Sequence, residues 1–134
     1  MNIRLAARQI TSFLEARMHG MDLSLAQFGL MLHIAAAEDD TIGGLAGRAG
    51  LDQSTLSRNL RGLERAGLVE IAIVEKDLRR RAVWLTEAGA RRLEAAIPIW
   101  RRAHKELSRV LNPDDVRRIA ASAATLTDGL ISPH

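Results

Sequence analysis

Apolar residues recur at helical spacing along most of the chain. Over residues 2–18 they lie three or four positions apart, which predicts a first helix that ends before a break at residues 20–23. Ser24 and Gln27 have the spacing of a capping box, in which each side chain accepts a hydrogen bond from the other residue's backbone N–H. A second helix is therefore expected to begin there. Its expected buried side consists of Phe28, Met31, Leu32 and Ala35.

A short helix, a turn and a further helix are expected next. Thr41 is placed to cap the short helix at residues 42–49, which three interior glycines make intrinsically weak. Gly50 supplies the turn, and Asp52 is placed to accept the free backbone N–H groups at the start of the following helix. That helix should end at Gly67, because glycine readily adopts a left-handed conformation. Its apolar stripe consists of Leu56, Leu60 and Leu63. This order is the helix-turn-helix arrangement.

The hydrophobic period changes from helical to alternating after residue 68. Alternating apolar residues predict a strand over residues 69–74, and Ala82–Leu85 predict a second strand. Residues 75–81, EKDLRRR, lie between them and are strongly basic. The pattern therefore predicts a β-hairpin with a basic tip directly after the helix-turn-helix. Such a tip is either a solvated turn or a DNA contact beside the helix.

Two longer helices are expected after the hairpin. Thr86 marks the start of the first, and Pro98 within it predicts a kink because proline removes one backbone hydrogen bond. Asn112 and Pro113 provide a cap and a first helical residue for the second. The second helix has an apolar stripe of Val116, Ile119, Ala123, Leu126 and Leu130. A domain of this size is not expected to cover all its terminal stripes, so the pattern implies a partner, most commonly a second copy.

Composition narrows the class of protein. Of the 134 residues 47% are hydrophobic but only 3% are aromatic, so the core is expected to be mainly aliphatic and helical. The absence of cysteine excludes disulfides, thiolate zinc sites and thiol-based oxidant sensing. The first ten residues contain no long apolar run, so neither a secretory signal nor a membrane span is expected. We therefore expect a soluble cytoplasmic protein with no membrane partner.

Charge is distributed unevenly along the chain. The formal net charge is only +3, and 17 of the 19 basic residues are arginine. Residues 48–81 contain seven arginines and Lys76 against five acids. A basic surface around the helix-turn-helix is the electrostatic footprint expected of a nucleic-acid-binding protein. The same excess is also compatible with an ordinary solvated surface.

The outer side of the helix at residues 52–66 has side chains suited to a major groove. Small hydroxyls can approach base edges closely, and arginine can hold a guanine or a phosphate with two hydrogen bonds. The candidate base-reading residues lie towards its N-terminal end: Gln53, Ser54, Ser57 and Arg58. The candidate phosphate-binding residues are Arg48, Thr55, Arg61 and Arg65.

Several of these segments together resemble the MarR family of winged-helix regulators. The resemblance rests on LDQSTLSRNLRGLERAGLVE, on Asp77 and Arg79 in the hairpin tip, on LTEAG at residues 85–89 and on the start of the last helix, LNPDDVRRI. It covers nearly the whole chain, in the right order. It implies a mainly α fold with a small β-hairpin wing, in which a winged helix-turn-helix core is flanked by N- and C-terminal dimerisation helices.

The resemblance also implies roles for individual segments. Residues 24–86 would bind DNA, and residues 1–23 and 87–134 would form the dimerisation region of one continuous compact domain. The homodimer would bind a pseudo-palindromic double-stranded operator, with the recognition helix at residues 52–66 in the major groove. The wing at residues 75–81 would reach the minor groove. The wing residues implied are Asp77, Arg79, Arg80 and Arg81, and the chain departs from the family's wing pattern at Leu78.

Many members of that family release DNA when a small aromatic or phenolic compound binds near the junction of the DNA-binding and dimerisation regions. Candidate residues for such a pocket are Met18, His19, His33 and Trp100. The alternative is that these residues are structural, because methionine at helical spacing is generally core and an isolated histidine is usually hydrogen-bonded within the fold. A repressor relieved by a ligand and a ligand-independent regulator both remain compatible with the sequence.

Other functional classes fit the sequence less well. The histidines at 19, 33, 104 and 134 form no i, i+4 pair, so no metal site is expected, nor any cofactor. Asp114 with Asp115, or His104 with Glu106, are conceivable acid–base pairs, but capping or solvent exposure explains them, and no nucleophile elbow or phosphate loop is present. We therefore expect no enzymatic activity. The principal alternative is a winged-helix module that binds another protein instead of DNA.

Overall fold

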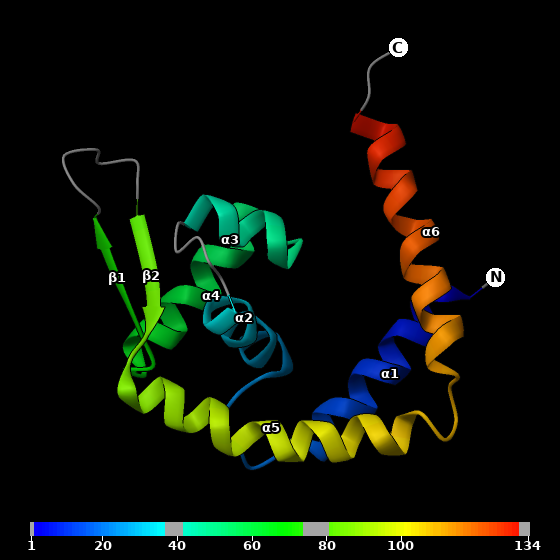
Figure 1. Cartoon of the computed structure of the whole chain (residues 1–134), viewed down its shortest axis with the longest axis horizontal. Coiled ribbons are helices and arrows are strands. Elements are labelled where there is room, and N and C mark those ends of the chain that lie inside the picture. The colour runs from blue at the N-terminus through cyan, green and yellow to red at the C-terminus, as the bar shows by residue number, and fades with distance from the viewer. Residues whose placement is uncertain (1, 37–41, 74–80, 132–134) are drawn as a thin grey trace. The chain divides into compact units, whose positions relative to one another are not determined.

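The computed structural model describes residues 2–36, 42–73 and 81–131. Over these residues the chain forms six helices and one two-stranded antiparallel sheet (Figure 1). The elements in order are α1 (Ile3–Arg17), α2 (Leu25–Ala36), α3 (Ile42–Ala49), α4 (Gln53–Arg65), β1 (Val69–Ile73), β2 (Arg81–Leu85), α5 (Glu87–Leu107) and α6 (Pro113–Ile131). The chain divides into two compact units, Met1–Trp100 and Arg101–His134. The mainly helical fold with a hairpin wing is therefore confirmed.

The predicted boundary between the first two helices is confirmed by hydrogen bonds. The backbone N–H of Ser24 donates to Gln27 Oε1, and the backbone N–H of Gln27 donates to Ser24 Oγ, each over 3.1 Å. In the preceding turn Gly20 and Asp22 both have positive φ, at 97° and 55°. Aspartate is one of the few residues with a side chain that tolerates this conformation. The chain therefore turns sharply before the capping box begins α2.

The core of the first unit is built around α2. This helix contacts α1, α3, α4 and β2. The prediction for its buried side was partly wrong: Phe28 and Met31 are buried, but Leu32 is half-buried and Ala35 is exposed. Leu30 and Ile34 are buried instead. The reason is that α2 is covered on several sides, so its burial does not follow a single stripe.

The hairpin formed by β1 and β2 packs against α2, α3 and α4. Val69 pairs with Leu85, Glu70 with Trp84, and Ile71 with Val83. Val69 and Val83 are buried in the core, and Ile71 and Leu85 pack against it, whereas Glu70 and Trp84 on the other face are exposed. The first strand begins at Val69 as predicted and is described as far as Ile73, because Val74 lies outside the described residues. The second strand begins at Arg81, one residue earlier than predicted, and ends at Leu85. One face of the hairpin is used to close the core.

The second unit contains the end of α5 and all of α6. Asn112 Oδ1 accepts the backbone N–H of Asp114 over 2.9 Å, and Pro113 is the first residue of α6, as predicted. Every described side chain of α6 is exposed, including Val116, Ile119 and Leu126. α5 is a continuous helix through Pro98, where the sequence predicts a kink. None of the described helices combines the length and apolarity needed to cross a membrane.

Candidate DNA interface

The turn between α3 and α4 forms the helix-turn-helix. Leu45 is fully buried and anchors α3 to the core. Gly50 has φ 65°, and the backbone N–H of Leu51 donates to the carbonyl of Ala46 over 3.3 Å. This left-handed conformation, which glycine adopts without a steric penalty, lies in the short turn between the end of α3 at Ala49 and the start of α4 at Gln53. The cap predicted at Thr41 lies outside the described residues.

Asp52 organises the first turn of α4. Its Oδ1 accepts the backbone N–H of Thr55 over 2.8 Å and the hydroxyl of Ser54 over 2.9 Å. These hydrogen bonds, that of Thr55 first, lower the pKa of the Asp52 carboxyl, so the group is ionised at neutral pH. Because Ser54 donates its proton to Asp52, its oxygen is left to act as an acceptor. Cytosine N4 and adenine N6 are the donors that a major groove offers to such an oxygen.

The two sides of α4 are chemically distinct. Leu56, Leu60 and Leu63 are at most 2% exposed, which confirms the predicted stripe. The structure brings most of the predicted contact residues of this helix onto its exposed surface: Gln53, Ser54, Ser57, Arg58, Arg61 and Arg65. Thr55 is half-buried. Arg58, Arg61 and Arg65 make no ion pair with any described residue, so their guanidinium groups are available to an anionic or base-edge partner.

The end of α4 is fixed by its own cap and by a junction with the start of α5. Gly67 has φ 74°, its N–H donates to the carbonyl of Glu64, and the N–H of Leu68 donates to that of Leu63, each over 2.9 Å. This pair of backbone hydrogen bonds is a Schellman cap, and it confirms the predicted helix end. The Thr86 hydroxyl donates to the Gly67 carbonyl over 2.6 Å and accepts the N–H of Gly89 over 3.0 Å. A single threonine thus connects the end of α4 to the start of α5.

Gly89 is needed at this junction for steric reasons. A Cβ atom built there would lie 1.9 Å from the carbonyl oxygen of Leu68, far inside van der Waals contact. Only a residue without a side chain therefore allows α5 to approach the backbone this closely. The spacing of Thr86 and Gly89 is the one sequence signal for this junction. The residues that they contact, Gly67 and Leu68, lie about 20 positions earlier, and local sequence patterns do not indicate such a distant contact.

Most of the predicted wing lies outside the described residues. Asp77, Arg79 and Arg80 lie outside the described residues, as do the side chains of Arg48 and Arg81. The paired strands place the backbone of Ile73 opposite that of Arg81.

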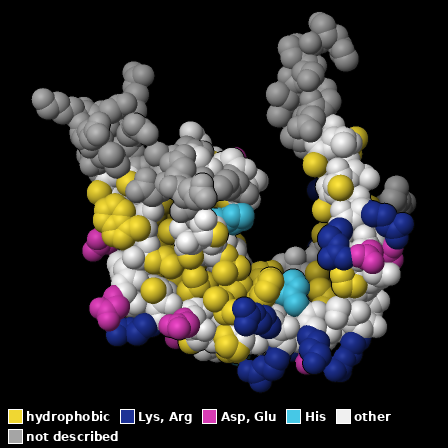
Figure 2. Space-filling view, in the orientation of Figure 1, with side chains coloured by type: hydrophobic (Ala, Val, Ile, Leu, Met, Phe, Trp, Pro, Cys, Tyr) yellow, Lys and Arg dark blue, Asp and Glu magenta, His cyan; other side chains and the backbone are white. Residues whose placement is uncertain are grey.

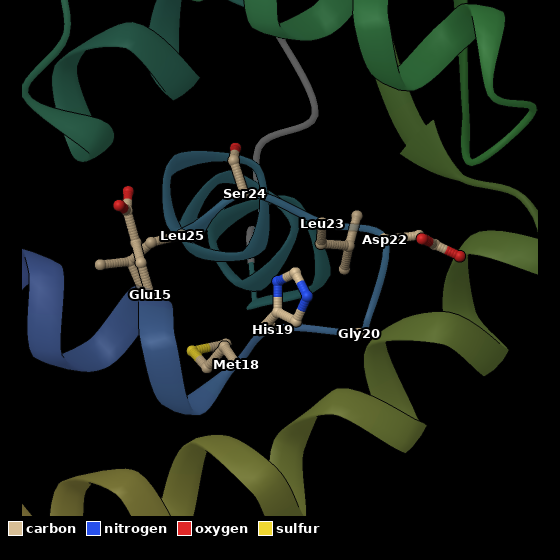
Figure 3. Close-up of a pocket in the computed structure, with 8 residues that line it drawn as sticks. All are labelled: Glu15, Met18, His19, Gly20, Asp22, Leu23, Ser24 and Leu25. Carbon is tan, nitrogen blue, oxygen red and sulfur yellow. The ribbon is translucent and has the colours of Figure 1, made fainter.

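The predicted ligand-pocket residues fall in different places. A cavity of about 460 Å³ at the turn between α1 and α2 is lined by Met18 and His19 (Figure 3). The other lining residues are Glu15, Gly20, Asp22, Leu23, Ser24 and Leu25. Trp100 does not line it and instead contacts Phe28, with ring centroids 5.9 Å apart. His33 is exposed on α2 and does not line it either. Among the described residues, no group of three or more side chains could hold a metal ion.

Comparison with known proteins agrees with this arrangement. The sequence model of the MarR family matches residues 21–80. The fold is similar to that of the transcriptional regulator MosR of M. tuberculosis in complex with DNA, with 29% identity, a TM-score of 0.86, and coverage of 97% of this chain and 96% of that chain. No curated protein matches the sequence.

Two other solved structures are similar in fold alone. The regulator PcaV of Streptomyces coelicolor, in complex with its natural ligand, is 21% identical with a TM-score of 0.79, covering 94% of this chain and 89% of that one. Bordetella bronchiseptica BpsR, whose DNA binding is regulated by 6-hydroxynicotinic acid, is 18% identical with a TM-score of 0.78, covering 93% and 95%. The MarR family model thus covers the helix-turn-helix and the first strand of the hairpin, and the fold is shared over nearly the whole chain with a DNA-bound transcriptional regulator, so the chain is similar in sequence and fold to transcriptional regulators of the MarR family.

Proposed function

We propose that the chain acts as a homodimeric repressor that binds a pseudo-palindromic double-stranded operator and releases it when a small ligand binds. The observation that carries this proposal is the division of α4 into a fully buried leucine stripe and an exposed surface of short polar side chains and guanidinium groups that form no ion pair with any described residue. The same set of groups matches the donors and acceptors of a major groove and its flanking phosphates.

The proposed roles follow from position along α4. Gln53, Ser54, Ser57 and Arg58 form the base-reading end. The ionised Asp52 beside Ser54 supports this division, because a phosphate placed there would face a like charge. Phosphate contacts are assigned to Arg61 and Arg65 further along α4, to Arg48 on α3 and to the half-buried Thr55. The wing residues Asp77, Arg79, Arg80 and Arg81 are assigned to the minor groove.

Dimerisation is proposed because apolar side chains of α6, outside the proposed DNA-binding region, are exposed. Val116, Ile119 and Leu126 on α6 are 46%, 58% and 69% exposed, and they recur at helical spacing. A second copy would cover this stripe and place two α4 helices about one helical turn of DNA apart. Residues 1–23 and 87–134 would then form the dimerisation region, and residues 24–86 the DNA-binding region.

A ligand site is proposed at the turn between α1 and α2. Its volume of about 460 Å³ suits a small molecule, and Met18 gives it an apolar wall beside the His19 ring. Two regulators of the same fold provide the precedent, one solved with its natural ligand and one regulated by 6-hydroxynicotinic acid. A small aromatic or phenolic effector is therefore the chemical class we propose, with His33 and Trp100 as more distant contributors.

Selection of bound fragments from a random double-stranded DNA library tests this function. The expected product is an inverted repeat with half-sites about 10 base pairs apart, as a two-fold protein requires. The selected site, placed upstream of a reporter gene, should lower its expression in the presence of the protein. Lack of any enriched sequence would contradict the proposal and would favour a winged-helix module that binds another protein.

A further inference from the structure

The outer side of the hairpin has a second depression, separate from the cavity at the turn between α1 and α2. It has a volume of about 410 Å³ and joins the end of α4 to the hairpin. Figure 2 shows hydrophobic side chains exposed over the hairpin with an acidic side chain beside them. The lining residues are Glu64, Gly67, Val69, Glu70, Ile71, Ala72, Trp84 and Thr86. No part of the proposed DNA or effector function uses this site.

Trp84 is the largest exposed group in the depression. Its side chain is 40% exposed, although a tryptophan on a small hairpin would usually be buried. The indole N–H donates to Glu70 Oε2 over 3.1 Å, and the two residues are cross-strand partners. This bond fixes the edge of the ring against the carboxylate and leaves ring surface open to the depression. The electron-rich face of a tryptophan is the best side-chain surface for binding a cation.

The electrostatics of the depression favour the same class of ligand. Glu64 and Glu70 are negatively charged, and none of the other lining residues carries a positive charge. Glu64 also lies in the last turn of α4, where the helix dipole contributes partial negative charge. This local acidity is notable in a chain whose net charge is +3. An indole face, two carboxylates and a helix C-terminus all stabilise positive charge.

We propose that this depression binds a small organic cation, an ammonium or quaternary ammonium compound seated on Trp84 and flanked by Glu64 and Glu70. The depression is large enough for such a molecule, and Ala72, on the same face of β1 as Glu70, offers apolar surface to alkyl groups attached to the charged nitrogen. A cation bound there contacts both the end of the recognition helix and the hairpin. The site goes beyond the proposed function and does not depend on it.

Tryptophan fluorescence of the full chain tests the proposal without DNA. The chain has two tryptophans, so a Trp100→Phe variant makes Trp84 the only reporter. Choline is the probe, and 3,3-dimethylbutan-1-ol is its uncharged isostere. Choline should change the emission saturably, and the alcohol should bind at least about tenfold more weakly. Sodium chloride at the same ionic strength is the control for screening.

Substitutions identify the site. Glu70→Gln keeps an acceptor for the indole N–H but removes the charge, and with Glu64→Gln it should weaken choline binding about tenfold or more. The matched control is Glu87→Gln with Glu94→Gln, two exposed acids on α5 that should leave binding unchanged. Trp84→Leu should abolish broadening of the choline methyl signal in proton NMR spectra.

Three results would overturn the proposal. One is equal binding of choline and the alcohol, which would show that charge is irrelevant. Another is choline binding that the Glu64→Gln, Glu70→Gln and Trp84→Leu substitutions all leave unchanged. The third is saturation by an arginine-rich peptide with no response to choline, which would assign the surface to a protein partner. Because none of these measurements uses DNA, their failure would leave the proposed regulatory function untouched.

Discussion

α4 and α6 have the same kind of hydrophobic pattern but different surroundings. In α4, Leu56, Leu60 and Leu63 are at most 2% exposed. In α6, Val116, Ile119 and Leu126 recur at similar spacing and are between 46% and 69% exposed. An apolar stripe therefore shows that a helix has a face to cover, but not what covers it. For α4 the cover is the chain's own core, and for α6 we propose a second copy of the chain.

The largest expected effect on stability comes from truncating a buried leucine of α4. Leu63→Ala should lower the free energy of unfolding by about 2–5 kcal/mol, because Leu63 is fully buried and its removal leaves a cavity. Chemical denaturation at several protein concentrations measures this. Ile119→Ala removes the same number of carbon atoms from α6 and should act mainly through concentration-dependent association. If both variants lowered the free energy of unfolding equally and independently of protein concentration, the two helices would not differ in what covers them.

Placing a charge in the exposed stripe tests what covers it. Ile119→Glu should cost the dimer on the order of 2 kcal/mol or more, since a carboxylate would be buried without a partner. Light scattering should then show a monomer where the unmodified chain is a dimer. Ala121→Glu, on the opposite side of α6, adds the same charge and should leave the dimer intact. A dimer that survives Ile119→Glu would place the interface elsewhere.

Gly47 in α3 and Gly89 in α5 differ in the space that is available for a methyl group. A Cβ atom at Gly47 of α3 would have no atom within 4 Å, whereas one at Gly89 would meet the Leu68 carbonyl. Gly47→Ala should therefore stabilise the fold by about 0.5–1 kcal/mol, because alanine loses less backbone entropy in a helix. Thermal unfolding should show a higher Tm for Gly47→Ala and a lower Tm for Gly89→Ala. A lower Tm for both would mean that α3 needs its glycines.

The smallest effect concerns the caps, since α4 begins at a carboxylate and α6 at an amide. The pKa of Asp52 is lowered in the folded state, so its stabilising contribution is present above its ordinary pKa of 3.8 and is lost as pH falls through the lowered value. Asp52→Asn keeps a good cap that does not titrate. The unmodified chain should therefore lose stability relative to Asp52→Asn below about pH 4 in acid titration. Parallel acid curves would show that the charge of the Asp52 carboxylate makes no net contribution.

Local signals accounted for most of the fold. The Ser24–Gln27 pair, Asp52, Gly67 and Asn112 each mark a helix end within four residues, and the structure has a boundary at each. Sequence spacing could not show how α2 is buried, because that depends on helices and a strand that contact it from several directions.

The candidate site was predictable to a similar degree. The exposed side of α4 follows from helical spacing, because the buried leucines determine which residues lie opposite. Two features were not predictable: the hydrogen bond from the Thr86 hydroxyl to the Gly67 carbonyl, and the acidic depression beside Trp84. Both depend on contacts between residues 14 or more positions apart, which appear only once the hairpin and the start of α5 are folded onto α4.

The central claim is that the exposed side of α4 reads DNA, and a salt series with the selected operator tests it most directly. Fluorescence anisotropy should show that Arg58→Ala loses roughly 1–3 kcal/mol of binding free energy and accepts other bases at one position. Arg61→Ala should instead weaken binding to all sequences and lower the slope of log affinity against log salt by about one. Equal affinities and slopes for both variants and the unmodified chain would contradict the account.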